Sequence, residues 1–156
     1  TKDITFGQLI DRIGTAMDFQ FPCGYHMEKS ITNITSFEKI IYPPIIKEQY
    51  INLSGMENYY IRLLNSGKFD IPSIINSIFE YTAKCIISIS EILNKNHKFN
   101  TIIITGGVAS NSIIRNFIVN SLNNKYKLIF PDNKNSSDNA IGVAFLPIID
   151  RWYNEA

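Results

Sequence analysis

The chain has 156 residues, of which 45% are hydrophobic, and this combination suits one domain with a buried core. A formal net charge of +1 excludes the strong basic excess of a dedicated nucleic-acid-binding domain. The two cysteines, Cys23 and Cys85, have neither disulfide-framework nor zinc-site spacing, which favours a reducing cytoplasm. No signal peptide is expected, and the charges within the apolar stretch 74–93 exclude a simple membrane span.

The first third of the chain predicts two helices separated by a loop. Residues 5–17 place apolar side chains at helical spacing, and Thr5 stands where a helix N-cap is expected. Residues 19–24 contain a proline and a glycine, so we expect a loop there. A short helix then follows from Tyr25.

The middle of the chain predicts extended segments followed by two helices. Residues 39–53 contain two successive prolines and alternating apolar residues, which favour a hairpin. Ser54-Gly-Met-Glu57 has the Ser-x-x-Glu form of a capping box and predicts a helix to about Leu64, ended by a glycine. The apolar stripe of residues 71–94 predicts a long helix.

The last third of the chain alternates strands and helices. Residues 101–105 form a continuous run rich in β-branched side chains, which is typical of a strand buried on both faces. Residues 127–130 predict a second short strand, and a polar loop follows it. We expect helices at 110–122 and 138–152 to pack against the sheet. This order predicts an α/β fold with a central sheet flanked by helices.

Gly106 and Gly107 lie directly between the predicted strand and the next helix. Glycine permits positive φ angles and leaves no Cβ in the way of a ligand. The helix that follows presents unpaired backbone N–H groups and the positive end of its dipole. The pair therefore suits either a phosphate cradle or a tight turn without a ligand, because its spacing matches neither a Walker loop nor a Rossmann fingerprint.

Three polar side chains have both a structural and a functional interpretation. Asp11 has Gly7 four residues before it and Gly14 three after it, so a groove there could admit a ribose. The alternative is a solvated aspartate. Asn111 suits a ligand contact or the first turn of a helix. Asp138 suits a helix-start acid or a hard oxygen ligand for a metal.

Five motifs, taken in order, resemble the TsaD/Kae/YgjD family. That family carries G-E-A-F-D-K, P-G-G-P, S-G-L-K, G-G-V-x-A-N and T-D-N-A segments. The corresponding segments of this chain are Gly7-Gln-Leu-Ile-Asp11-Arg, Pro22-Cys-Gly24-Tyr, Ser54-Gly-Met-Glu57, Gly106-Gly-Val-Ala-Ser-Asn111 and Ser137-Asp-Asn-Ala140. Each motif is weak alone, but together they span nearly the whole chain in register.

The resemblance implies an actin-like, ribonuclease-H-like fold, with residues 1–156 as its C-terminal lobe and the N-terminal lobe absent. It implies transfer of a threonylcarbamoyl group from its adenylate to an adenosine of certain tRNAs. The residues that would bind ATP or threonylcarbamoyl-adenylate are Asp11, Gly24, Gly106, Gly107 and Asn111. Asp138 would be one ligand of an iron or zinc ion held only by the full-length protein. No catalytic residue is identified, and the isolated chain is expected to be inactive.

The implied partners are tRNA as a substrate of the full-length protein, together with TsaB-like and TsaE-like proteins, in the cytoplasm and without a membrane. Three departures from the family pattern are visible. The family's histidine pair, which supplies further metal ligands, belongs to the absent half. Gln8 replaces a glutamate, and Cys23 replaces a glycine.

These departures fit a second interpretation, a non-catalytic actin-like paralogue that binds a nucleotide or a partner, as TsaB-like proteins do. A third interpretation, a metallopeptidase, rests on the older name of the family, O-sialoglycoprotein endopeptidase or glycoprotease. The sequence contains no protease motif that supports it.

Overall fold

The computed structural model describes residues 1–44, 46–47 and 50–132. The elements in chain order are α1 (Phe6–Ala16), α2 (Cys23–Ile31), β1 (Ile46–Lys47), β2 (Tyr50–Ile51), α3 (Ser54–Ser66), α4 (Ile71–His97), β3 (Thr101–Ile103), the 3-10 turn η1 (Val108–Ser110), α5 (Ser112–Leu122) and β4 (Lys127–Ile129). The predicted helix 138–152 lies outside the described residues.

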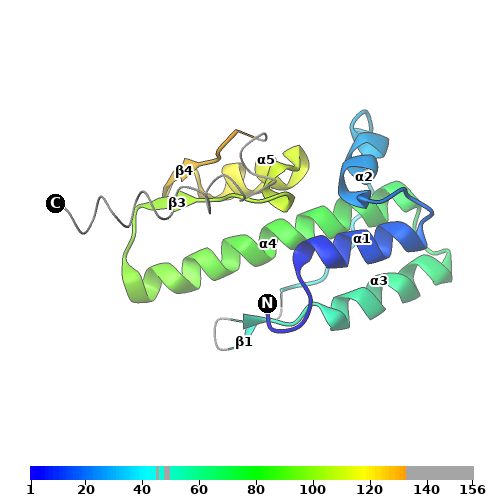
Figure 1. Cartoon of the computed structure of the whole chain (residues 1–156), viewed down its shortest axis with the longest axis horizontal. Helices are drawn as coiled ribbons and strands as arrows, with labels where there is room; N and C mark the ends of the chain where they lie inside the picture. Colours follow the sequence, from blue (N-terminus) through cyan, green and yellow to red (C-terminus); the bar gives the residue numbers. More distant parts are fainter. Residues whose placement is uncertain (45, 48–49, 133–156) are drawn as a thin grey trace, which may run out of the picture.

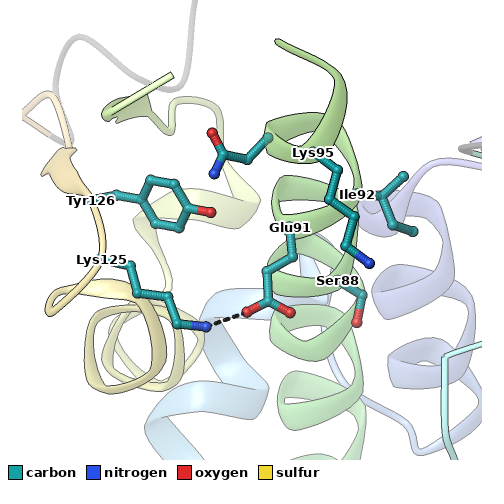
Figure 2. Close-up of a pocket in the computed structure, with 7 residues that line it drawn as sticks. Ser88, Glu91, Ile92, Lys95, Lys125 and Tyr126 are labelled. Carbon is teal, nitrogen blue, oxygen red and sulfur yellow. Dashed lines mark hydrogen bonds and ion pairs between the residues drawn. The ribbon is translucent and has the colours of Figure 1, made fainter. Parts of the chain in front are cut away.

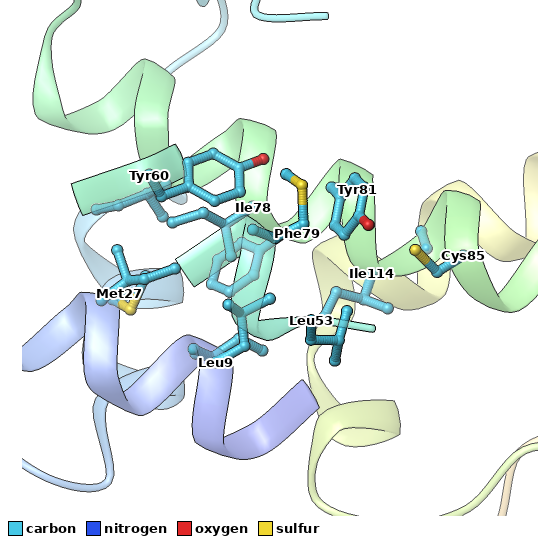
Figure 3. Packing of buried hydrophobic residues seen from close by; sticks show 14 of the residues in the cluster. Leu9, Met27, Leu53, Tyr60, Ile78, Phe79, Tyr81, Cys85 and Ile114 are labelled. Atoms are coloured by element: carbon cyan, nitrogen blue, oxygen red, sulfur yellow. The ribbon is translucent and has the colours of Figure 1, made fainter. Parts of the chain in front are cut away.

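Helix α4 runs along the molecule and packs against α2, α3 and α5 (Figure 1). Asp70 caps its start, because its carboxylate accepts a hydrogen bond from Ser73 N at 2.7 Å. The helix ends at His97, three residues beyond the predicted Asn94, where the left-handed backbone of Lys98 terminates it. Figure 3 shows the core that α4 organises, with Phe79 and Ile114 among its fully buried side chains.

Strand β3, helix α5 and strand β4 form a β–α–β unit beside α4. Strands β3 and β4 pair in parallel, with Ile103 opposite Ile129, and α5 is the crossover between them. α5 packs against α4. Strand β3 (Thr101–Ile103) is shorter than the predicted strand 101–105. The expectation that both of its faces are buried is wrong, since Ile103 is 65% exposed. Among the described residues β3 pairs only with β4.

The predicted hairpin is confirmed, since β1 and β2 pair antiparallel. The helix that follows begins at Ser54 as expected, but the predicted capping box does not form. Asp3 takes that role, because its carboxylate oxygens accept hydrogen bonds from Leu53 N and Ser54 N at 2.9 and 2.8 Å. Glu57 instead pairs with Arg12 of α1 at 2.9 Å.

The structure confirms one predicted helix start and corrects two others. The structure confirms Thr5 as the cap of α1, in a box with Gln8. Helix α2 begins at Cys23 rather than Tyr25, so the predicted loop is shorter and Gly24 lies in the first helical turn. Helix α5 begins at Ser112 rather than Ser110, because η1 precedes it.

Candidate functional site

Asp11 joins the first two helices. It lies on α1, half-buried, and its Oδ1 accepts a hydrogen bond from Cys23 N at 2.8 Å. Because that N–H would otherwise be unpaired at the start of α2, the carboxylate fixes where this helix begins. Gly24 is the next residue, and a Cβ on it would lie 3.5 Å from Ile10. The structure thus brings Asp11 and Gly24 close together, and their role in ligand binding stays a prediction.

The two glycines around Asp11 have different surroundings. A Cβ at Gly14 would lie 2.4 Å from the Cβ of Cys23 and 2.8 Å from the sulfur of Met27. That space is filled by helix α2, so the predicted groove is wrong on the Gly14 side. A Cβ at Gly7 would lie 3.9 Å from Val108, which shows that the start of α1 approaches η1.

The glycine turn is open. Gly106 has a φ of +109°, which L residues rarely adopt, whereas Gly107 has an ordinary φ of −58°. A Cβ at either position would meet no atom within 4 Å. The backbone N–H groups of Gly106 and Gly107 donate to no other residue in the described part of the chain. A glycine here can serve a positive φ angle or leave space for a ligand. The first reason applies to Gly106 alone.

Asn111 is the N-cap of α5. Its Oδ1 accepts a hydrogen bond from Ile114 N at 2.9 Å, and the residue is only 7% exposed. Its Nδ2 is buried and has no hydrogen-bond partner among the described residues. The sequence left Asn111 open between a structural and a ligand-binding role. The cap is a structural role, and the unpaired amide nitrogen leaves a donor available for a second.

A residue that the sequence did not single out connects the two halves of this site. Glu28, on α2, accepts a hydrogen bond from Ser112 N at 2.8 Å, and the hydroxyl of Ser112 donates to the same oxygen. Helices α2 and α5 are thereby tied together. No local motif predicts a contact between residues 84 positions apart. The one available signal was that Glu28 has no oppositely charged residue four positions before or after it on its own helix.

Asp138 is outside the described residues, which contain no group of three or more histidine, cysteine or acidic side chains suited to a metal. A hollow of about 460 Å³ lies between α4 and the segment that follows α5, where Lys125 and Glu91 form an ion pair at 2.7 Å (Figure 2). None of the predicted site residues within the described part of the chain lines it.

Two further observations concern the second cysteine and the helices. Burial raises the pKa of Cys85 to about 11, so its thiol stays protonated at neutral pH and is a poor nucleophile. No helix among the described residues combines the length and the apolar character needed to cross a bilayer.

Comparisons with known proteins place the chain among one family. A family model described as tRNA N6-adenosine threonylcarbamoyltransferase, TsaD, matches residues 1–145. A protein of that name from Malacoplasma penetrans is 25% identical over 150 residues, which are 93% of this chain and 47% of the relative. One from Rickettsia bellii is 30% identical over 168 residues, covering 99% of this chain and 49% of the relative. The chain thus spans about half the length of these relatives.

A solved structure described as HypF of T. kodakarensis has a similar fold. The TM-score is 0.72 at 13% identity, over 90% of this chain and 19% of that one. At this identity the likeness concerns the fold alone. Together with the helices and the parallel strand pair, it confirms the predicted α/β, actin-like fold class.

Proposed function

This chain belongs to the tRNA N6-adenosine threonylcarbamoyltransferase family, and from that premise we propose that it forms the C-terminal lobe of such a transferase. In this proposal the site lies in a cleft between two lobes, with this lobe supplying one wall. The lobe binds an adenine nucleotide, either ATP or threonylcarbamoyl-adenylate. The threonylcarbamoyl group then passes to an adenosine of tRNA.

The open glycine turn carries the proposal. Gly106 and Gly107 present backbone N–H groups that no other described residue accepts, and their Cβ positions face empty space. A phosphate can approach such a backbone closely and accept several hydrogen bonds from it. Asn111, the cap of the helix that follows the turn, adds a buried amide nitrogen without a hydrogen-bond partner among the described residues.

Asp11 and Gly24 form the second part of the proposed nucleotide site. One oxygen of Asp11 is committed to Cys23 N, and the other accepts no hydrogen bond from a described residue. That second oxygen is suited to a ribose hydroxyl. Gly24 leaves the adjacent surface without a side chain, so a sugar could approach the helix start.

Further elements of the proposal involve groups outside the described residues. Asp138 would donate one carboxylate to a divalent iron or zinc ion, and the remaining ligands would come from other parts of the full-length protein, since stable sites use about three or four protein ligands. The metal would supply Lewis acidity there. TsaB-like and TsaE-like proteins and tRNA are the proposed partners, in the cytoplasm.

A non-catalytic module that binds a nucleotide or a protein partner is the second candidate. It is favoured by the structural use of Asp11, which fastens α2, and of Gly14, which lets α2 approach α1. Both residues would be needed for folding even in a protein without activity.

Calorimetric titration with ATP tests the role of the turn, using the 156-residue chain and its Gly107→Val variant. The ordinary φ of Gly107 tolerates valine, so the variant should fold while its affinity falls by more than about tenfold, or roughly 1.4 kcal/mol. Gly55→Val is the matched control, since Gly55 also has no atom within 4 Å of its Cβ position.

Equal ATP affinity of the wild type and a folded Gly107→Val variant would refute a phosphate site at the turn. A transfer assay with threonylcarbamoyl-adenylate and tRNA, using the full-length protein, separates the transferase from the non-catalytic module. Transfer that is lost in Gly107→Val supports the transferase. Nucleotide binding without transfer supports the module.

A further inference from the structure

One end of the molecule is basic, although the chain as a whole is nearly neutral. Two segments form this end, residues 91–101 at the end of α4 and residues 122–129 around the start of β4. Glu91 is the one acidic residue in both segments together, and their excess of positive charge is larger than the net charge of +1 of the whole chain. The four lysines of these segments are all exposed, and we call them the basic end: Lys95, Lys98, Lys125 and Lys127.

The fold brings these two segments together. Helix α4 leads almost directly into β3, and β4 pairs with β3 in parallel, with Lys127 opposite Thr101 (Figure 1). The N–H of Lys127 donates to the carbonyl of Asn100 at 2.8 Å. The ring of Tyr126 packs against Phe99 at a centroid distance of 5.7 Å. The basic end is therefore assembled by the fold from two segments that are distant in the sequence.

The hollow of about 460 Å³ is part of this basic end, since Lys95 and Lys125 both line it, together with Tyr126 (Figure 2). Its volume falls within the range of sites for small ligands, about 300–1,000 Å³. Asn94 also lines the hollow, and its Oδ1 is buried without a hydrogen bond from any described residue. A buried acceptor without a donor is costly. A ligand that donates a hydrogen bond at this position would satisfy it.

Most of the positive charge at this end is available to a partner. Lys125 forms an ion pair with Glu91 at 2.7 Å, but both side chains are substantially exposed, and such surface pairs stabilise a protein little. The other three lysines form no ion pair with another residue in the described part of the chain. The partner that fits this surface therefore carries several negative charges as well as hydrogen-bond donors.

We propose that the basic end is a docking surface for tRNA, with one nucleotide seated in the hollow. RNA carries a negative charge at every phosphate and a 2′-hydroxyl on every sugar, so it supplies both the anions and the donors that this surface lacks. The lysines contact phosphates, and a hydroxyl or base N–H donates to Oδ1 of Asn94. That the RNA is a tRNA rests on the function proposed above. The glycine turn follows the opposite end of β3, so the two sites do not overlap.

The test is a titration of a fluorescently labelled tRNA transcript with the 156-residue chain, followed by anisotropy at several salt concentrations. The double variant Lys95→Gln/Lys127→Gln should bind tRNA more weakly than the wild type. The slope of log affinity against log salt concentration should become shallower by about 1.5, because each phosphate contact contributes about 0.7–0.9. Both lysines are exposed and outside ion pairs with described residues, so the variant should fold.

Lys39→Gln/Lys68→Gln is the matched control, because it removes the same charge from exposed positions near the start of α4. The N–H of Glu38 donates to Ser73 in the first turn of that helix, and Lys68 lies three residues before it. A helix of 27 residues separates these positions from the basic end by about 40 Å. The control should change neither the tRNA affinity nor the salt slope. Equal losses in the two double variants overturn the proposal.

Asn94→Ala tests the hollow separately from the charges. Alanine removes an acceptor that has no donor in the protein and is a strong helix former, so the variant should be at least as stable as the wild type. It should bind tRNA about fivefold more weakly, as expected for one lost hydrogen bond, without a change in the salt slope. Wild-type affinity of Asn94→Ala for tRNA overturns the seating of a nucleotide in the hollow.

Two further comparisons complete the test. Poly-glutamate or phosphatidylserine vesicles bound as tightly as tRNA would overturn the assignment of RNA as the partner. Weaker tRNA binding by Lys95→Gln/Lys127→Gln, together with unaltered ATP binding by Gly107→Val, would support the docking surface and reject the phosphate site at the turn. Loss of ATP binding in Gly107→Val, together with unaltered tRNA binding by the double variant, would support the nucleotide site and reject the docking surface.

Discussion

The contact between α1 and α2 and the turn before α5 use glycine for opposite purposes. At Gly14 the absence of a Cβ lets Cys23 and Met27 approach the helix closely. At Gly106 and Gly107 the absent Cβ leaves space that no other atom of the described residues occupies. A glycine against a packed neighbour serves the fold, whereas an open pair beside a helix start is available to a ligand.

The largest effect should come from filling the packed glycine. In Gly14→Ala the new methyl group would lie 2.4 Å from the Cβ of Cys23, which is a rigid part of its neighbour, so the two helices must separate. Overpacking of this kind costs about 3 kcal/mol. Urea unfolding followed by circular dichroism measures the loss.

Gly55→Ala is the control for that experiment. Gly55 lies in α3 with no atom within 4 Å of its Cβ position, so alanine should raise the stability by up to about 1 kcal/mol. Similar unfolding midpoints for Gly14→Ala and the wild type would show that α1 and α2 are not tightly packed.

A smaller loss in the free energy of unfolding, of about 1–2 kcal/mol, is expected where only the backbone angle requires a glycine. Gly106→Ala must place an L residue at a φ of +109°, although its side chain meets nothing. The same urea unfolding measures the loss. A Gly106→Ala variant as stable as the wild type would indicate that the turn adopts another conformation in solution.

The start of α3 should carry a pH dependence, because a carboxylate caps it. Partial burial alone would raise the pKa of Asp3, but the hydrogen bonds from Leu53 N and Ser54 N outweigh it and hold the pKa below its ordinary value. Asp3 therefore stabilises the fold above the unfolded-state pKa of about 3.9, and this contribution is lost as the pH falls below about 4.

Asp3→Ala should cost about 1 kcal/mol at pH 7, as for other helix caps. Its stability should also fall less steeply than that of the wild type between about pH 4 and pH 2. Unfolding curves at several pH values give both quantities. Parallel stability profiles of the two proteins would exclude Asp3 as the cap of α3.

The same contrast explains which parts of the structure the sequence predicts. Helices follow from apolar periodicity, and the local cap Thr5 is read directly from its neighbours. The starts of α2, α3 and α5 instead receive carboxylates that lie 12, 50 and 84 positions away. No local pattern identifies such partners, so the predicted start of α2 was late and the Ser-x-x-Glu signal of α3 was misleading.

The candidate site shows the same limit. Sequence motifs identified Asp11, Gly24 and Asn111, and their roles in ligand binding stay predictions. Their immediate contacts, a helix start for Asp11 and a cap for Asn111, follow only from the fold. Glu28 was missed because its partner, Ser112, becomes a neighbour only when α2 packs beside α5.

The smallest effect on stability should come from Gly107→Ala, and this makes it the most informative variant. Gly107 has a φ of −58°, which alanine adopts without strain, and its Cβ position is open. Alanine also restricts the unfolded chain, so stability should be unchanged or higher by up to about 1 kcal/mol. If Gly107→Ala nevertheless weakens ATP binding in a calorimetric titration, the loss arises at the ligand and not from the fold. A destabilisation comparable to that of Gly106→Ala would mean that both glycines serve the turn itself, and the distinction between packed and open glycines would fail.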